Sequence, residues 1–413
     1  MRKIILNSFL SLCFCVFFLF AGCETLPDSY SGTCPKPEVL AEFKIPADVP
    51  VILLPVTFDG KEYDFILDTG ATHVVFDASL KDKLGKRFLW PRKGKKVGGE
   101  TFKVEFFHAP RAYLGSLNLK DCMFVIVDDL EPVSSVLKTK IHGILGMNFL
   151  EDYVIQIDFD KAKILFLKGK KNTDIFSFLR PKENEHPEWG ECISIKRRFL
   201  DRSPYVQADF DGHIATLMVD TGHYVQIPTP NVTGVAGILK KRTFERVCPV
   251  QSKGYGVVET LSVGSLEYKE LVFKQDTPSL LGLFFLSRHM VTFDFPNNKM
   301  YLKKGKDFDR PTGLPLSLEQ LDFTLCRNRG NTVVSSIDPN GLGHRKGIRQ
   351  DDVLLKIENQ DVSSYGLVEL VEFFSQPPKE QDGVLTFTFK RGDDIINISF
   401  TNSDIASERD GTD

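Results

Sequence analysis

Two copies of the tripeptide Asp-Thr-Gly, at Asp68 and Asp220, are the residues of this chain best suited to do chemistry. A carboxylate on a tight loop after a buried strand is held rigidly, and the glycine lets a second loop approach closely. If the two loops face one another, the carboxylates cannot both ionise, so they share one proton and their apparent pKa values separate. The ionised member can then deprotonate a water while the protonated member donates to a carbonyl oxygen. The pair therefore predicts hydrolysis of a peptide bond without a metal or a covalent intermediate.

An internal repeat surrounds these loops. Residues 54–70, LPVTFDGKEYDFILDTG, match residues 206–222, VQADFDGHIATLMVDTG, at a constant offset of 152 residues. Each copy predicts a strand, an Asp-Gly hairpin turn and a second strand that runs into the Asp-Thr-Gly loop. A single Asp-Thr-Gly is ordinarily no more than a turn after a strand, but two copies in register indicate a duplicated unit.

The repeat continues beyond the loops. Ile144-Leu145-Gly146 is matched by Leu280-Leu281-Gly282, and the hairpin sequence of 156–168 is matched by 292–304, both at an offset of 136 residues. Short strands with Gly-rich turns and little helical periodicity predict two all-β lobes. We expect four residues to support the aspartates, the threonines by side-chain hydrogen bonds and the glycines by close backbone approach: Thr69, Gly70, Thr221 and Gly222.

These motifs carry a resemblance to a known family. The Asp-Thr-Gly-Ala at Asp68, the Ile-Leu-Gly that follows and their repetition in one chain resemble the pepsin and retropepsin class of aspartic peptidases. Residues 45–304 resemble more closely the bacterial retropepsin-like aspartyl peptidases, in which two fused lobes are often followed by a PDZ domain. The resemblance implies a mainly β fold, with two pseudo-two-fold related retropepsin-like β lobes plus a C-terminal α+β PDZ domain. It assigns catalysis to Asp68 and Asp220.

The same resemblance implies a flap, a Gly-containing hairpin that covers the cleft. In the first lobe its tip would lie at Gly98 and Gly99, and Tyr255 would lie in the counterpart of the second lobe. One position departs from the family pattern, because His223 stands where a small residue is usual. Its imidazole could crowd the water or, when protonated, hold both carboxylates ionised, or it could point away and be harmless. We name His223 as a candidate modulator of the site.

A third domain begins where the composition changes, near Pro311-Thr312-Gly313. The residues that follow predict an α+β domain that resembles a PDZ domain, with Gly347-Ile348 and 352–354 as its most specific run; an unrelated small α+β domain is the alternative. PDZ domains bind an extended peptide by strand addition. They also hold the C-terminal carboxylate of that peptide with loop N–H groups, and the loop best placed for this contains Leu321, Asp322 and Phe323. The segment 313–316 is an alternative, but Pro315 lacks an N–H. Asp322 stands where glycine is usual, and its charge would repel a C-terminal carboxylate.

The N-terminus has the features of a secretory signal. Arg2 and Lys3 precede an apolar run that ends at Ala21-Gly22-Cys23, which resembles a bacterial lipobox, although Phe20 replaces the usual Leu, Val or Ile. Cys23 would then be lipidated and anchor the mature protein stably. The alternative is an ordinary cleaved signal peptide. We expect a lipid-anchored protein of the bacterial cell envelope, on the periplasmic face of the outer membrane.

Composition narrows the remaining possibilities. The 413 residues carry a net charge of −3, which gives no broad basic field, so we expect no nucleic-acid partner. The sequence has no HExxH, GxSxG or GxxxxGK motif, and its cysteines have no CxxC spacing. We therefore expect neither a metal nor a cofactor.

The organisation that we predict is a signal peptide (1–22), a lipidated tether (23–42), a first peptidase lobe (43–169), a linker (170–190), a second lobe (191–305), a PDZ domain (306–402) and a polar tail (403–413). The leading hypothesis is a membrane-tethered aspartic endopeptidase that acts on peptides or proteins and also binds a peptide through its PDZ domain. Its rival is a non-catalytic adaptor lipoprotein with the same fold. A structural envelope lipoprotein would leave the paired loops unexplained.

Overall fold

The computed structural model describes residues 37–46, 51–95, 101–169, 186–197, 202–223, 235–248, 250–252, 254–309, 313–314, 323–328, 331–366, 369–370, 373, 384–401 and 404. This part of the chain is mainly β, as the sequence predicts. The signal segment, Cys23 and most of the tether lie outside it. Within the described residues no helix is both long and apolar enough to cross a membrane.

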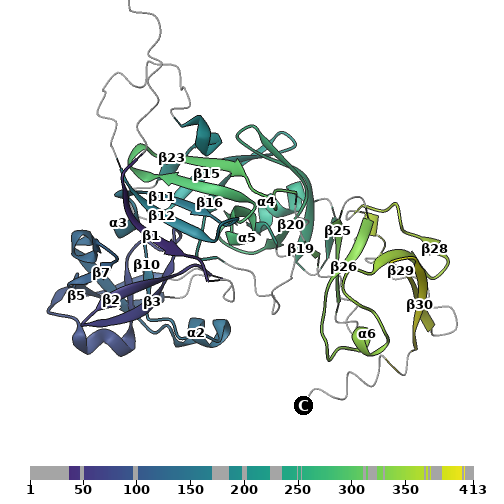
Figure 1. The fold of residues 1–413 in the computed structure, drawn as a ribbon, viewed down its shortest axis with the longest axis horizontal. Helices are drawn as coiled ribbons and strands as arrows, with labels where there is room; N and C mark the ends of the chain where they lie inside the picture. Colours follow the sequence, from purple (N-terminus) through teal and green to yellow (C-terminus); the bar gives the residue numbers. More distant parts are fainter. Residues whose placement is uncertain are drawn as a thin grey trace, which may run out of the picture. The chain divides into compact units, whose positions relative to one another are not determined.

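Lobe 1, residues 51–169, is built on a nine-stranded sheet in the order β5-β6-β9-β4-β10-β3-β2-β7-β8 (Figure 1). Its strands are β2 (Leu53–Phe58), β3 (Lys61–Leu67), β4 (Val75–Asp77), β5 (Arg87–Lys95), β6 (Thr101–His108), β7 (Ala112–Leu114), β8 (Leu117–Asn118), β9 (Phe124–Asp128) and β10 (Gly143–Leu145). Its helices are the 3-10 helices Ala78–Lys83 and Leu119–Cys122, α2 (Glu131–Leu137) and α3 (Met147–Leu150).

Lobe 2, residues 186–309, contains an eight-stranded sheet in the order β14-β15-β16-β21-β17-β20-β19-β18. Its strands are β14 (Lys196–Arg197), β15 (Pro204–Phe210), β16 (His213–Val219), β17 (Gly237–Leu239), β18 (Val250–Ser252), β19 (Tyr255–Val263), β20 (Leu266–Gln275) and β21 (Leu280–Leu281). Its helices are the 3-10 helices Pro187–Trp189 and Phe295–Asn297, α4 (Lys241–Val247) and α5 (Leu283–Leu286).

The hairpins predicted from the repeat are present in both lobes. β2 and β3 pair antiparallel around Asp59-Gly60, and β15 and β16 pair antiparallel around Asp211-Gly212. All four turn residues have positive φ, with Asp59 at 51° and Gly60 at 73° in the first turn. This geometry matches the twist of two neighbouring strands, which is why Asp-Gly is favoured there.

A six-stranded sheet joins the lobes, in the order β1-β12-β11-β22-β23-β13. Its strands are β1 (Val39–Lys44), β11 (Tyr153–Asp158), β12 (Lys163–Lys168), β13 (Glu191–Ser194), β22 (His289–Asp294) and β23 (Lys299–Lys304). At its centre β11 of lobe 1 pairs with β22 of lobe 2, and Gln156 faces Thr292, its equivalent in the repeat. The Gln156 Nε2 donates to Thr292 Oγ1 at 3.0 Å.

Three boundaries differ from those predicted. Residues 39–42, expected in the tether, belong to β1, which pairs with β12 (Figure 1). Trp189, expected in the linker, is buried against Tyr301 of β23. Residues 306–308, expected in the PDZ domain, contact the lobes, because Lys306 N donates to Asp160 and Phe308 packs against Tyr268. Tertiary contacts far apart in sequence decide each of these boundaries.

The C-terminal domain has a seven-stranded sheet, with β28 paired to β27 beside the path β24-β25-β26-β27-β29-β30. Its elements are β24 (Gly313–Leu314), β25 (Phe323–Asn328), β26 (Asn331–Ile337), α6 (Leu342–Arg345), β27 (Val353–Ile357), β28 (Gln360–Asp361), β29 (Val384–Arg391) and β30 (Asp394–Thr401). The short helix before Gly347 and the hairpin that turns at Gly392 agree with the sequence prediction.

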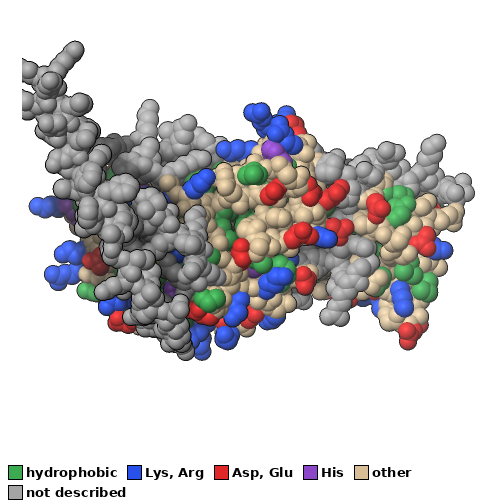
Figure 2. All heavy atoms as spheres, turned by 90° about the horizontal axis from the view of Figure 1, so that it is seen from above, with side chains coloured by type: hydrophobic (Ala, Val, Ile, Leu, Met, Phe, Trp, Pro, Cys, Tyr) green, Lys and Arg blue, Asp and Glu red, His purple; other side chains and the backbone are tan. Residues whose placement is uncertain are grey.

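The lobes are filled with phenylalanine. Phe65, Phe76 and Phe166 in lobe 1 and Phe273 and Phe293 in lobe 2 are fully buried. On the face drawn in Figure 2, acidic and basic side chains alternate over the described surface. No field of one sign covers that face, in keeping with the small net charge.

Candidate active site

Asp68 and Asp220 stand at the ends of equivalent strands. In lobe 1, β10 runs parallel to β3, and Asp68 N donates to Leu145 O at 3.1 Å. In lobe 2, β21 runs parallel to β16, and Asp220 N donates to Leu281 O at 3.0 Å. The leucine before Gly146 and the leucine before Gly282 thus each fix the backbone of the aspartate in their own lobe.

The two loops are tied together by their threonines. The Thr221 Oγ1 accepts from Thr69 N at 3.0 Å, and Thr69 Oγ1 accepts from Thr221 N at 3.0 Å. Each hydroxyl also donates across the lobe boundary, Thr69 to Val219 O at 2.7 Å and Thr221 to Leu67 O at 2.8 Å. Both threonines are buried, so every one of these groups depends on its partner.

The glycines allow the carboxylates to meet. A Cβ added to Gly70 would lie 2.6 Å from Asp220 Cγ, and one added to Gly222 would lie 2.3 Å from Asp68 Cγ. Both distances are far inside van der Waals contact, so no larger residue fits while the opposite aspartate keeps its place. Each carboxyl group thus lies against the opposite loop, close enough to the other for the two to affect one another's pKa.

The surroundings of the pair separate the two protonation states. Burial raises the pKa of Asp68, whereas donated hydrogen bonds from Asp220 and from the backbone N–H groups of Gly70 (2.7 Å) and Ala71 (3.0 Å) oppose this effect. Burial, the negative charge of Asp68 and the hydrogen bond to Asp68 raise the pKa of Asp220 well above its ordinary value. The pKa of Asp220 is therefore raised further than that of Asp68, although Gly222 N also donates to Asp220 at 2.9 Å, and this difference favours the shared proton on Asp220.

A residue that the sequence analysis did not name holds the Asp68 loop from behind. Asn148, in α3, accepts from Val74 N at 2.7 Å and donates to Phe124 O at 2.9 Å through its buried amide. The same helix receives the loop carbonyls, because Met147 N donates to Ala71 O at 2.8 Å. The only signal in the sequence was a polar residue two positions after Gly146, in a segment that is otherwise apolar.

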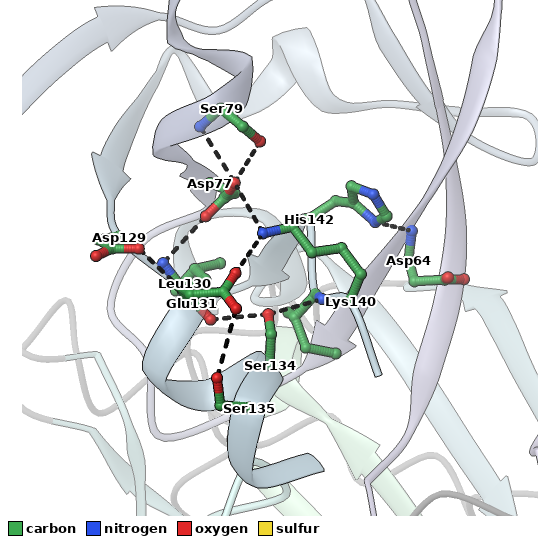
Figure 3. Close-up of polar contacts among 11 residues, drawn as sticks. Asp64, Asp77, Ser79, Asp129, Leu130, Glu131, Ser134, Ser135, Lys140 and His142 are labelled. Atoms are coloured by element: carbon green, nitrogen blue, oxygen red, sulfur yellow. Dashed lines mark hydrogen bonds and ion pairs between the residues drawn. The ribbon is translucent and has the colours of Figure 1, made fainter. Parts of the chain in front are cut away.

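A polar network supports β10 at the opposite end (Figure 3). Asp77, buried at the end of β4, accepts from Ser79 N at 3.1 Å and from Leu130 N at 3.0 Å. Lys140 lies 3.7 Å from Asp77 and 2.9 Å from Glu131, which begins α2. These bonds hold the connection between β9 and β10 against β4, so they fix the start of β10, the strand whose last residue accepts from Asp68 N.

His223 occupies, beside Asp220, the sequence position that Ala71 occupies beside Asp68, and its backbone N–H lowers the pKa of Asp220. Its carbonyl accepts from Leu283 N at 2.9 Å. The imidazole packs near Gly282, and its Nε2 is buried without a hydrogen-bond partner. Burial, followed by the charge of Lys274, lowers the pKa of His223, so the neutral ring is favoured. The backbone of His223 therefore contacts the pair, while its ring carries no hydrogen bond to either aspartate.

The expected flap is described in part. β5 and β6 form an antiparallel hairpin in lobe 1 whose last described pair is Lys95 with Thr101. Gly98 and Gly99 lie outside the described residues. Tyr255 begins β19 of lobe 2, opposite Ser252 and Lys274, and no described hydrogen bond or ring contact joins it to the aspartates.

The expected peptide-binding loop of the C-terminal domain is also described in part. Leu321 and Asp322 lie outside the described residues. Phe323 opens β25, is 7% exposed, and its ring contacts those of Phe387 and Phe389. Its side chain is thus part of the core of the domain, and only its backbone remains for a peptide. Among the described residues, no group of three or more His, Cys, Asp or Glu side chains could hold a metal ion.

Comparison with known proteins agrees with this geometry. Residues 54–149 match the family model of aspartyl proteases, and residues 314–389 match that of PDZ domains. No curated protein sequence matches the chain.

Two seed globulins are among the solved structures that are similar. Conglutin gamma, a basic 7S globulin from lupine seeds, is 10% identical, covers 65% of this chain and 96% of its own, and gives a TM-score of 0.38. The basic 7S globulin from soybean is 10% identical, covers 65% of this chain and 95% of its own, and gives a TM-score of 0.36. Neither likeness is strong enough to carry a conclusion about this chain. The family models do carry one: the chain contains a retropepsin-like aspartyl protease domain and, after it, a PDZ domain.

Proposed function

We propose that this chain is an aspartic-type endopeptidase that hydrolyses peptide bonds with a water activated by Asp68 and Asp220. The observation that carries the proposal is the pair of facing loops, in which each aspartate lies against the glycine of the other loop and the pKa of Asp220 is raised well above that of an ordinary carboxyl group. One proton between two carboxylates supplies both the base and the acid that the reaction needs.

The roles follow from where the proton resides. Ionised Asp68 takes a proton from water as the water oxygen attacks the peptide carbonyl carbon, and Asp220 gives its proton to the carbonyl oxygen. The tetrahedral intermediate collapses when Asp68 returns its proton to the amide nitrogen and the C–N bond breaks. Asp220 recovers a proton from the hydroxyl group of the intermediate, which restores the starting pair.

We propose further that the protein acts in the bacterial cell envelope, anchored through a lipid on Cys23. The support is the sequence that ends in Ala21-Gly22-Cys23 after an apolar run. The PDZ domain would select substrates or partners by adding an extended peptide strand to its sheet. We propose peptides or proteins as partners and no nucleic acid.

The test is cleavage of an unstructured protein by the purified chain between about pH 3 and pH 7, with and without a chelator. We expect the activity to rise as the pH falls from neutral, and we expect the chelator to leave it unchanged. Asp68→Asn and Asp220→Asn should each lower the rate on the order of a thousandfold. The double variant should lose little more, because the two groups act in one step.

A second function is favoured by one observation, the replacement of a small residue by His223 beside Asp220. In that reading the protein is a non-catalytic peptide-binding adaptor that keeps the fold. A parent protein that binds peptides but cuts none at any pH, and a His223→Ala variant that is equally inactive, would replace the peptidase proposal with this one.

A further inference from the structure

Beside the threonines and the shared sheet, the lobes are joined by ion pairs that converge on Glu151. This residue follows α3 of lobe 1, and its two carboxylate oxygens accept from Arg197 Nη1, at 3.1 Å, and from Arg202 Nη1. Arg197 ends β14 and Arg202 precedes β15, so both arginines come from lobe 2. Glu151, Arg197 and Arg202 are called the interlobe clamp below.

The clamp contacts the loop that carries Asp68 from two directions. On one side Glu151 extends α3, whose N–H groups hold the carbonyls of Ala71 and Thr72. On the other side Ser203, directly after Arg202, is buried and donates its Oγ to Gly70 O at 3.3 Å. A displacement of Arg202 relative to Glu151 would therefore be transmitted to both sides of this loop.

The positive charge of Arg202 affects the pKa of a residue in the loop that carries Asp68. The pKa of His73, five residues after Asp68, is lowered to about 4, first by burial and then by the positive charge of Arg202. The charge of Arg202 therefore acts on a residue of the Asp68 loop as well as on Glu151.

The backbone of Arg202 adds independent evidence. Its φ is 56°, in the left-handed region that side chains other than glycine rarely adopt. Such a conformation persists only where surrounding contacts impose it, and it is concentrated at functional sites. The ion pair to Glu151 and the buried Ser203 are the contacts that hold Arg202 in place.

The clamp has no charged counterpart in the other half of the repeat. The position of Glu151 corresponds to Ser287, at the offset of 136 residues, and that of Arg202 corresponds to Pro50, at the offset of 152. Serine and proline cannot form an ion pair, so the Glu151–Arg202 pair has no equivalent at these two positions of the repeat. Asp68 is the base of the proposed reaction, and it accepts hydrogen bonds from the N–H groups of Gly70 and Ala71.

We propose that Glu151 and Arg202 are positioning residues, which hold the Asp68 loop so that its N–H groups keep Asp68 ionised opposite Asp220. The idea rests on the proposed peptidase function. The side chains of Glu151 and Arg202 are 25% and 42% exposed, so a purely structural ion pair here would contribute little stability. The effect that we infer is on the alignment and ionisation of Asp68.

The kinetic experiment compares the parent with Glu151→Gln, Arg202→Gln and the charge-reversed pair Glu151→Arg with Arg202→Glu. Glu42→Gln, which removes the exposed partner of Lys163 in lobe 1, is the matched control. Loosening the loop weakens the N–H bonds to Asp68 and raises its pKa, so the acidic limb of kcat should move to higher pH in both single variants. We expect kcat at the optimum to fall on the order of tenfold with little change in KM, and charge reversal to restore part of it.

Amide hydrogen exchange of Gly70 and Ala71 tests whether the interlobe clamp holds the loop, and it requires no measurement of activity. Protection should fall in Glu151→Gln and Arg202→Gln and stay at the parent level in Glu42→Gln. If protection is unchanged in both variants, the clamp proposal is wrong. It is also wrong if the parent is active and the acidic limb of its kcat profile does not move in the variants. If the parent cuts no peptide, the peptidase proposal fails, while the exchange result still decides whether the clamp holds the loop.

Discussion

Thr69 and Thr221 exchange hydrogen bonds reciprocally, each hydroxyl accepting the backbone N–H of the other at 3.0 Å. Each hydroxyl then donates to the carbonyl one residue before the opposite aspartate, Thr69 to Val219 and Thr221 to Leu67. Because both threonines are buried, the four bonds form a closed set across the lobe boundary. The distance between the two aspartates is therefore set by residues that take no part in proton transfer.

Replacing either threonine by alanine should lower both stability and activity. Thr69→Ala removes one hydroxyl and leaves Thr221 N and Val219 O unpaired, at a cost of about 1–3 kcal/mol in the free energy of unfolding. Thr221→Ala should cost a similar amount, and the double variant less than the two together, since both belong to one network. Urea unfolding and cleavage assays measure this. The conservative Thr69→Ser should keep most of both properties, and equal damage from Ser and Ala would contradict the hydrogen-bond account.

The glycines of the loops should tolerate no side chain. A methyl group at Gly70 or Gly222 would overlap the carboxylate of the opposite aspartate, so Gly70→Ala and Gly222→Ala should separate the pair and abolish cleavage. Gly85→Ala is the matched control, because a Cβ there meets nothing within 4 Å. An active Gly222→Ala variant would show that the two carboxylates need not be adjacent.

The sequence predicted the parts of this site that local patterns encode. Asp59-Gly60 and Asp211-Gly212 form turns with positive φ, and such turns fix the register of the strands that lead to the aspartates. The repeat then implied that the second loop faces the first. Turn chemistry and duplication thus carried the prediction of the aspartates and of the threonines beside them.

Other features depend on contacts between distant residues. Glu151 meets Arg202 only because the lobes pack together, and neither position has a charged equivalent in the repeat. The sequence places residues 39–42 of β1 in the tether, because the pairing partner of this strand, β12, lies more than a hundred residues later. The ring of Phe323 packs in the core against Phe387, far along the chain, and the expected role of its backbone N–H in peptide binding stays a prediction.

Lipid anchoring through Cys23 can be tested in cells. Cys23→Ala should block lipid attachment, so the protein should leave the membrane fraction or accumulate with its signal segment uncleaved. Cys34→Ala, which alters a nearby cysteine of the tether, should fractionate as the parent does. Full membrane association of the Cys23→Ala variant would refute the lipobox interpretation.

The raised pKa of Asp220 predicts how stability depends on pH. The folded protein binds this proton more tightly than the unfolded chain, whose carboxyl group titrates near 3.8. Stability from this group is therefore greatest below that value and declines as pH rises toward the folded pKa. The asparagine of the Asp220→Asn variant cannot ionise. The free energy of unfolding of this variant should therefore fall less than that of the parent as the pH rises from about 3.8 toward the folded pKa. Urea midpoints at several pH values measure this, with Asp82→Asn at an exposed position as the control. Parallel curves for Asp220→Asn and the parent would show that Asp220 is not the proton carrier.

His223 decides whether the departure from the family pattern matters. The backbone N–H of His223, which His223→Ala keeps, is the group that acts on the pKa of Asp220, and burial favours the neutral ring, so this variant should leave both limbs of the pH–rate profile in place. An imidazolium beside the pair would instead favour ionised carboxylates, and removing it would move both limbs to higher pH. A faster reaction with unmoved limbs would indicate that the ring crowds the water. His213→Ala, on the preceding strand, is the control, since its side chain is turned to Arg246. A profile that shifts upward in His223→Ala alone would assign the ring a charge at working pH, contrary to the burial that surrounds it.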